Sequence, residues 1–405
     1  MTVKVKAPRH AFHYAPFRNL FFARTLTVLG NSVAPVALAF AVLDMGGSAA
    51  DLGVVVAARS LFNVLFLLTG GVLADRYSRN RVLLISSMIA ALSQSGVAWL
   101  VLDGSATLAG LAMLSAVNGA AAGIALPASS ALVPQTVPTQ KLRQANAFIQ
   151  SGVYAGTIIG ASLGGLLTST LGAGWGLAVD ALGFALAAPL YFSVRTEAQP
   201  SGTQTTLWQD LRDGWREFIS RSWVWAVVAQ FAVVNAAFTG MVMVLGPVIA
   251  DSAFGRTRWG MMIAAQSVGL IIGSGIALRW RPRRAMFTGV MLVALCVFPI
   301  LLLAGGASSG WLMGAFCLAG TGFGQFGVIW AQALQTHIPR DRLARVYAYD
   351  AMGSFITIPL GELAAGPLAM QFGTQAVLLS CAAAVLAATL AASLVPAIRR
   401  LKLTE

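Results

Sequence analysis

The sequence predicts an all-α polytopic membrane protein with twelve transmembrane helices in two bundles of six. Hydrophobic residues occupy 57% of its 405 positions, and the mean hydropathy is +0.76, well above the values of soluble globular domains. Apolar runs of about 20 residues, each long enough to cross a bilayer core of about 30 Å, recur through the whole chain. One long polar segment, residues 195–222, interrupts them after the sixth run. Two six-helix halves joined by such a segment indicate an internal duplication.

Each predicted span is a run of predominantly apolar residues. In the N-terminal bundle, residues 18–194, the spans are 18–43, 50–74, 82–102, 108–133, 145–170 and 174–194. In the C-terminal bundle, residues 223–396, they are 223–250, 258–279, 285–305, 310–337, 343–371 and 375–396. Residues 1–17 precede the first span and residues 397–405 follow the last. The first apolar run is too long for a signal peptide, so we expect it to be retained as a helix.

The basic residues predict how the chain is oriented in the membrane. With residues 1–17 in the cytoplasm, all of the 27 Lys and Arg fall in cytoplasmic segments except Arg59, Arg256 and Arg258. This distribution satisfies the positive-inside rule. It predicts a multi-pass protein of the inner (cytoplasmic) membrane with both termini in the cytoplasm. We expect the protein to contact membrane lipid and to be a monomer. The net charge of +13 is thereby explained without a nucleic-acid partner.

The polar segment 195–222 divides into two parts. Its first part reads as a flexible linker. Its second part, Leu207 to Ile219, carries Trp208, Leu211, Trp215 and Phe218 at helical spacing. This spacing predicts an amphipathic helix on the inner membrane surface.

The short loop between the second and third spans gathers charge in a chain that is only 10% charged. It reads Gly71-Val72-Leu73-Ala74-Asp75-Arg76-Tyr77-Ser78-Arg79-Asn80-Arg81. An ordinary positive-inside loop explains the arginines but not Asp75 among them. The stretch resembles the G-x-L-A-D-R-x-G-R-x-R signature of the major facilitator superfamily, with only the inner Gly changed, to Ser78.

The resemblance implies that this loop, with Gly71, Asp75, Arg76, Arg79 and Arg81, latches the cytoplasmic side of the two halves. Its Asp would dock near the start of helix 11, close to Arg342–Arg345. The counterpart loop of the second half has Arg279 where the Asp would fall, so the latch is expected on one side only. Proton-coupled members of the family often carry an Arg in helix 4, where this chain has Ser115. Proton coupling would therefore need other groups.

The fifth span carries closely spaced glycines. Gly156, Gly160, Gly164 and Gly165 are similar to the family's exporter signature G-x-x-x-G-P-x-x-G-G, with Ala161 in place of the Pro. Small residues at intervals of four also occur wherever membrane helices pack closely. Both interpretations stay open at this point.

Helix 11 reads R-V-x-x-x-D…P-L-G…G-P, and the first span begins with "FRNLFFAR". These features resemble the branch of the superfamily that contains macrolide-efflux proteins and the enterobactin exporter. The resemblance implies outward transport of a sizeable amphipathic organic molecule by drug:proton antiport.

A charge inside a membrane span is costly and suggests function, and four charged residues stand out in the predicted spans. They are Arg59, Asp180, Asp350 and Glu362. Asp350 lies near the start of its helix, where a structural hydrogen bond is one role and gating another, and Asp180 is equally suited to packing or to carrying a proton. Glu362 is the deepest carboxylate and the preferred proton site. Arg59 and Glu362 lie at matching depths. Either they pair across the halves, or each finds a partner in its own half or points into the water-filled cavity.

In the family, helices 1, 4, 7 and 10 line the substrate cavity, so the resemblance implies candidates on those spans. These are Asn31, Asn118, Asn235, Phe238, Met241, Gln325, Trp330 and Gln332. Neutral amides, aromatic rings and Met suit an amphipathic ligand. Each amide is equally suited to a hydrogen bond between helices.

The sequence lacks the marks of an enzyme. It has no HExxH or GxSxG motif, only three His, and no GxxxxGK[ST] loop for ATP. Cys296, Cys317 and Cys381 lie in apolar spans without CxxC spacing, which indicates packing residues and no metal site. We therefore expect a transporter without catalytic residues or cofactor, driven by the proton gradient. An importer, a facilitator, a lipid flippase and a non-transporting receptor of the same fold stay open.

Overall fold

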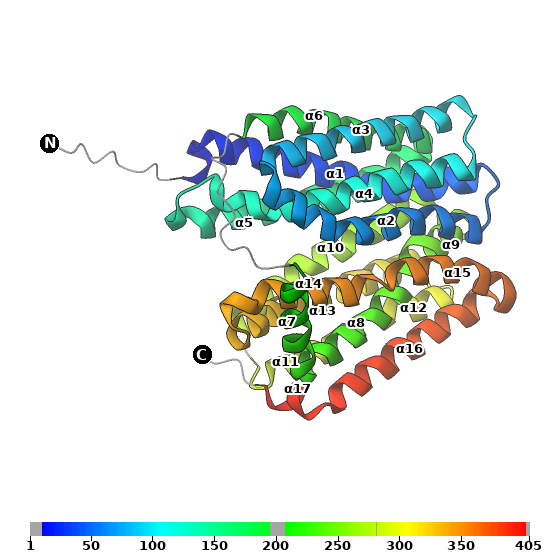
Figure 1. Cartoon of the computed structure of the whole chain (residues 1–405). Helices are drawn as coiled ribbons and strands as arrows, with labels where there is room; N and C mark the ends of the chain where they lie inside the picture. The colour runs from blue at the N-terminus through cyan, green and yellow to red at the C-terminus, as the bar shows by residue number, and fades with distance from the viewer. Residues whose placement is uncertain (1–9, 195–206, 281, 402–405) are drawn as a thin grey trace.

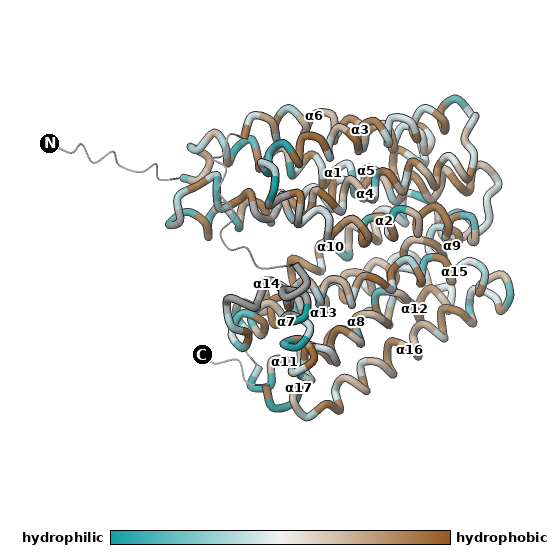
Figure 2. Tube along the Cα trace, in the orientation of Figure 1, coloured by the Kyte–Doolittle hydropathy of each residue, from teal (hydrophilic) through white to brown (hydrophobic). Residues whose placement is uncertain are grey.

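The computed structural model describes residues 10–194, 207–280 and 282–401, all of whose regular elements are helical. Twelve of its helical segments are long and apolar enough to cross a membrane, which confirms the predicted number. Figure 2 shows hydrophobic residues along the lengths of these helices and hydrophilic ones mostly at their ends. The chain is a multi-pass membrane protein.

The N-terminal half contains six long helices joined by short turns (Figure 1). In order, the elements are a 3₁₀ turn at Ala11–His13, α1 (Ala15–Asp44), α2 (Ala49–Arg76), α3 (Arg79–Asp103), α4 (Leu108–Leu132), 3₁₀ turns at Val133–Gln135 and Thr139–Lys141, α5 (Leu142–Thr170) and α6 (Ala173–Ser193). The first span thus begins before residue 18, the predicted start.

The C-terminal half begins with the amphipathic segment and contains several interrupted spans. In order, it has α7 (Leu207–Ser220), α8 (Ser222–Gly240), a π-helical turn (Met241–Leu245), α9 (Gly246–Ala253), α10 (Arg256–Arg279), α11 (Ala285–Val293), a 3₁₀ turn (Ala294–Cys296), α12 (Val297–Ala304), α13 (Ser309–His337), α14 (Arg340–Phe355), α15 (Ile358–Phe372), α16 (Thr374–Leu394) and α17 (Pro396–Arg400).

The two ends of the spans differ in how the helices connect. We call the end that holds residues 10 and 401 the terminal side, and the opposite end the far side. Each far-side turn contains one glycine with positive φ, a conformation that other residues rarely adopt. These glycines are Gly46, Gly104, Gly172, Gly255, Gly306 and Gly373. Glycine therefore permits the far-side turns, whereas the basic connections after α2 and α10 lie on the terminal side.

The eleventh span is broken into α14 and α15, although its apolar run (343–371) predicts one continuous helix. The break lies at Ile356–Thr357, between α14 and α15, and Pro359 follows it. Pro cannot donate to the preceding turn, so the α-helical ladder is interrupted here. The Thr357 hydroxyl donates instead to the carbonyl oxygen of Ala232 on α8, at 2.6 Å.

The predicted amphipathic helix is present as α7, which lies across the other helices at the terminal side (Figure 1). Trp215 and Phe218 stack on each other and contact Tyr349 of α14. Phe218 is buried, whereas Trp215 is half exposed. The apolar face of α7 thus packs partly on its own half of the protein. The side chains of Trp208 and Leu211, and residues 195–206, lie outside the described residues.

Among the described residues, the main contacts between the halves pair α2 with α15 and α5 with α10. By contrast, α14 packs mainly on α7 and α8 of its own half. Figure 1 shows the halves one above the other, with α2 and α15 at their boundary. The closest contacts lie on the far side.

Glycines permit this far-side contact. A Cβ on Gly53 of α2 would lie 2.5 Å from the carbonyl oxygen of Glu362, and one on Gly366 would overlap the backbone of Ala49. On the other flank, a Cβ on Gly165 would lie 2.8 Å from the carbonyl oxygen of Arg256. Because real Cβ atoms do not approach backbone so closely, these positions require glycine. In this structure the two halves are closed against each other on the far side.

Candidate functional site: two polar cavities that share Arg59

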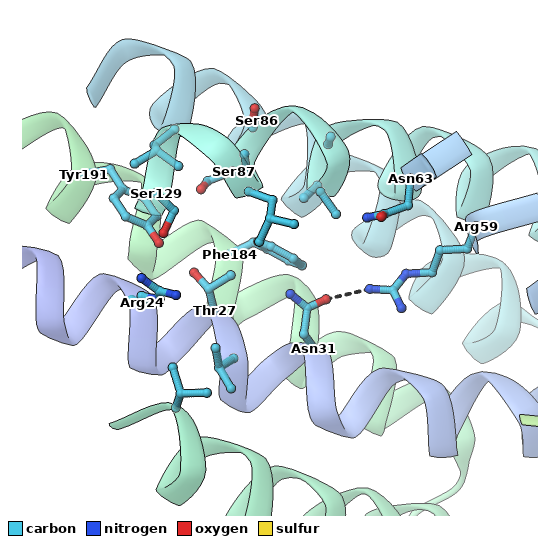
Figure 3. A pocket seen from close by; sticks show the side chains of 18 residues that line it. Arg24, Thr27, Asn31, Arg59, Asn63, Ser86, Ser87, Ser129, Phe184 and Tyr191 are labelled. Atoms are coloured by element: carbon cyan, nitrogen blue, oxygen red, sulfur yellow. Dashed lines mark hydrogen bonds between the residues drawn. The ribbon is translucent and has the colours of Figure 1, made fainter. Parts of the chain in front are cut away.

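A polar cavity lies inside the N-terminal half. It has a volume of about 340 Å³ and is lined by residues of α1–α6. Figure 3 shows Arg24, Thr27 and Tyr191 at one end, and Asn31, Asn63 and Arg59 at the other. Ser86 and Ser87 of α3 and Ser129 of α4 also line it. We call it the Arg24 cavity.

Arg59 is held by two amides of its own half. Its Nε donates to Oδ1 of Asn118 at 3.0 Å. Its Nη2 donates to Oδ1 of Asn31 at 2.8 Å (Figure 3). No carboxylate of the described residues forms an ion pair with it. Arg59 thus forms no direct ion pair with Glu362 in this conformation, and its Nε and Nη2 donate to the neutral amides of α4 and α1.

A second cavity, which we call the interface cavity, lies where the two halves meet. Its volume is about 210 Å³. Arg59, Ser60, Gln94 and Asn118 line it from the N-terminal half. Thr239, Met243, Ile358 and Glu362 line it from the C-terminal half. Arg59 lines both cavities, so it occupies the boundary between them.

Glu362 is almost fully buried, with 2% of its surface exposed. Its Oε1 accepts a hydrogen bond from Ser60 of the other half at 3.1 Å, while its Oε2 has no partner among the described residues. Arg59 precedes Ser60 on α2, so the two predicted charges do lie at matching depth and line one cavity. A buried carboxylate with one free oxygen at the interface of the two halves is suited to holding a proton.

Asp180 is fully buried between α6, α1 and α3. Gln94 of α3, which also lines the interface cavity, donates to its Oδ2, and its Oδ1 has no partner among the described residues. A Cβ on Gly30 would lie 2.6 Å from that free oxygen, so glycine makes room for the carboxylate. Arg59 interacts electrostatically with both Asp180 and Glu362. One cation therefore serves two buried carboxylates.

Asp350 has a different environment, in the C-terminal half alone. The indole Nε1 of Trp330 donates to its Oδ2 at 2.9 Å, and the Ser354 hydroxyl lies 3.5 Å from its Oδ1. Trp330 itself packs against Phe326 and Trp223. This geometry is a structural hydrogen bond that ties α14 to α13.

The predicted ligand-binding residues separate into two groups. Asn31 lines the Arg24 cavity and Asn118 the interface cavity, both as partners of Arg59. In the C-terminal half the candidates instead serve packing. Asn235 donates to the carbonyl oxygen of Ser354 at 2.8 Å, and Phe238 contacts other aromatic rings.

Burial differs among the remaining candidates of the C-terminal half. Met241 is fully buried in the π-helical turn, so its side chain cannot contact a ligand in this conformation. Gln325 is buried, whereas Gln332 is exposed, although seven residues of helix separate them. A shared helix face does not give a shared environment, because α13 packs on several neighbours along its length.

The sequence reasoning missed Arg24, Tyr191 and the serines of α3. The positive-inside rule counts Arg24 with the cytoplasmic basic residues. In the structure α1 begins at Ala15, so Arg24 lies more than two turns inside the helix and lines the cavity. The adjacent Ser86-Ser87 pair within an apolar span was an available signal.

The glycines of α5 pack on two different helices. A Cβ on Gly152, Gly156, Gly160 or Gly164 would crowd α1, whereas Gly165 faces α10 of the other half. The first four permit close packing within a bundle, as small residues do in membranes. Gly165 belongs to the far-side contact.

The predicted latch joins Asp75 to the start of α14. The side chains of Asp75 and of residues 340–345 lie outside the described residues, so the latch stays a prediction.

The sequence model of the Major Facilitator Superfamily matches residues 20–362, most of the chain. The chain belongs to this superfamily. It is therefore a transporter rather than an enzyme.

Solved structures of superfamily members share the fold at low sequence identity. The nucleoside transporter NupG, in a form carrying one substitution, has a TM-score of 0.79 at 14% identity, over 93% of this chain and 98% of that one. An inward-facing, unoccupied bacterial homologue of the human lysosomal transporter Spinster has a TM-score of 0.76 at 16% identity, over 97% and 98%.

Two superfamily relatives match over most of their length. The multidrug efflux pump Tap of Mycolicibacterium fortuitum is 26% identical, over 96% of this chain and 98% of the pump. The enterobactin exporter EntS of Escherichia coli O1:K1 / APEC is 26% identical, over 86% of this chain and 85% of the exporter. Relatives of this superfamily member thus move small organic molecules, drugs in one case and a siderophore in the other.

Proposed function

We propose that this chain is a proton-coupled exporter of amphipathic organic compounds such as drugs, macrolides or siderophore-like molecules. It works by alternating access, as an antiporter and as a monomer without a cofactor. The functions named for the pump Tap and the exporter EntS support export. The mixed polar and apolar lining of the Arg24 cavity supports an amphipathic cargo.

The orientation follows from charge. The terminal side holds the basic loops after α2 and α10, so by the positive-inside rule it faces the cytoplasm. The far side then faces outward, across the inner (cytoplasmic) membrane. A conformation closed on the far side is the one that loads cargo from the cytoplasm or the inner leaflet. Resistance to antibiotics is the physiological consequence for a cell that expresses such an exporter.

Glu362 carries the proposal of proton coupling. It is a buried carboxylate on one half that accepts its hydrogen bond from Ser60 on the other half. Opening of the far side would separate Ser60 from Glu362 and expose the carboxylate to outside protons. A proton taken up there would change the energy of closing the interface again. This links proton entry to the conformational step.

Charge balance supports a second proton site. Arg59 interacts with both Asp180 and Glu362, and one arginine balances the charge of one carboxylate. An unbalanced charge buried between membrane helices costs several kcal/mol by order of magnitude. We therefore assign Asp180 as an alternative proton carrier and Arg59 as the cation shared between the two sites. Asp350, with its bonds to Trp330 and Ser354, is left with a supporting role in gating.

The test is transport by purified protein in liposomes, with a drug or siderophore identified by efflux profiling of a sensitive strain. An imposed pH gradient should drive uphill movement of the compound and counterflow of protons, read by a pH dye in the lumen. Glu362→Gln should abolish the dependence on the gradient. Asp103→Asn, an exposed carboxylate at a far-side turn, is the matched control and should behave like wild type. Flux of equal size with and without the gradient would leave facilitated diffusion as the function.

A further inference from the structure

The Arg24 cavity has an unbalanced positive charge. Two arginines line it, Arg24 at one end and Arg59 at the other, and none of its described lining residues is Asp or Glu. Arg59 interacts electrostatically with Asp180 and Glu362, which lie outside this cavity. Among the described residues, Arg24 forms no ion pair. A cation within a membrane span is costly unless something balances it.

Arg24 lies in a polar setting that leaves room for an anion. Figure 3 shows its guanidinium beside Thr27 of α1 and near Tyr191 of α6, at the end of the cavity away from Arg59. Arg24 and Asn31 are seven residues apart on α1, about 10 Å along the helix. An acidic group at Arg24 is therefore separate from the Arg59 bonds that join α1, α2 and α4. A guanidinium binds a carboxylate through two parallel donors.

The rest of the lining is partly apolar. Phe184 projects into the cavity between the two arginines (Figure 3), and Leu83 and four alanines also line it. Ser86, Ser87 and Ser129 add hydroxyls from the opposite wall. A cavity of about 340 Å³ with this lining suits an aromatic or polycyclic body that carries one acidic group.

We propose that the Arg24 cavity binds amphipathic organic anions, with the acidic group on Arg24 and the aromatic body along Phe184. Neutral or cationic compounds of the same shape bind less tightly there, because they leave the arginine charge unbalanced. This proposal rests on the proposed function in one respect: it takes the bound anion to be the transported compound. It narrows the cargo class from amphipathic compounds in general to acids and ionised phenols.

The test is binding to the purified full chain in detergent, measured by calorimetry with 2-naphthoate and its neutral isostere 2-naphthamide. Naphthoate should bind about tenfold more tightly or better, the factor expected of one charge-assisted hydrogen bond. Arg24→Gln should remove this preference and leave naphthamide binding unchanged, while Arg24→Lys should keep most of it. Arg18→Gln, an exposed arginine on the same helix, is the matched control and should bind as wild type does.

Equal affinity of the wild type for the two probes would overturn the proposal, as would an absence of saturable naphthoate binding. So would an Arg24→Gln variant that keeps the preference. If that variant fails to fold, the two-probe comparison in wild type and Arg24→Lys still decides. The result is separable from the proposed function. Selective binding without gradient-driven flux rejects proton-coupled export and keeps the site, whereas flux without anion preference rejects the site and keeps export.

Discussion

Arg256 joins the two halves on the far side, and breaking this link should favour far-side opening. Its guanidinium donates to both carboxylate oxygens of Asp44, at the end of α1. The same guanidinium donates to Asp251 of its own half at 2.8 Å. Only the bond to Asp44 must break when the halves separate. Asp44→Asn therefore removes an interaction that exists only in the closed conformation.

The size of the effect follows from exposure. The Arg256 side chain is 20% exposed and that of Asp44 is 44% exposed, so water screens the pair. Such pairs contribute about 0.5–1 kcal/mol. The ratio of far-side-closed to far-side-open molecules should then fall by about two- to fivefold. The effect should shrink at high ionic strength, because salt screens exposed charges.

Pulsed electron paramagnetic resonance measures this ratio directly. In a cysteine-free background, spin labels at Ser105→Cys and Ser308→Cys report the distance between exposed far-side turns of the two halves. Asp44→Asn should increase the population at the longer distance. Asp251→Asn is the matched control, since its bond to Arg256 lies within one half, and it should leave the distribution unchanged. An unchanged distribution in Asp44→Asn, or an equal change in both variants, would refute the reasoning.

Three further predictions test other parts of the molecule. Gly53→Ala should also shift the spin-label distances toward the open form, because its Cβ would press on the carbonyl of Glu362, whereas Gly314→Ala, with open space around it, should not. Trp330→Phe should lower the free energy of unfolding by about 1 kcal/mol, since it leaves the partly buried carboxylate of Asp350 short of a donor; a melting temperature equal to wild type would contradict this. From the loop signature, Asp75→Asn should abolish or strongly reduce efflux at normal expression, and efflux at the wild-type level would count against a latch.

The sequence by itself determined the number of spans, the superfamily and the residues whose charge is costly. Hydropathy is a sum over neighbouring residues, so twelve apolar runs are visible without any tertiary contact. The signature around Asp75 is equally local, since it consists of adjacent residues. Arg59 and Glu362 could even be placed at matching depth, because depth in a regular helix grows by a fixed rise per residue.

Only the tertiary structure decided which side chains meet. At its depth in the membrane, Arg59 could pair with Glu362 or donate hydrogen bonds to amides of its own half. The rotation of α1 and α4 about their axes places Asn31 and Asn118 within hydrogen-bonding distance of it. Ser60 became the partner of Glu362 because glycines at the interface bring α2 and α15 close together. The helix rotations that turn Arg24, Ser87 and Tyr191 toward one cavity depend on packing across the whole bundle. No local pattern in the sequence encodes those rotations, because each results from contacts between residues far apart in the chain.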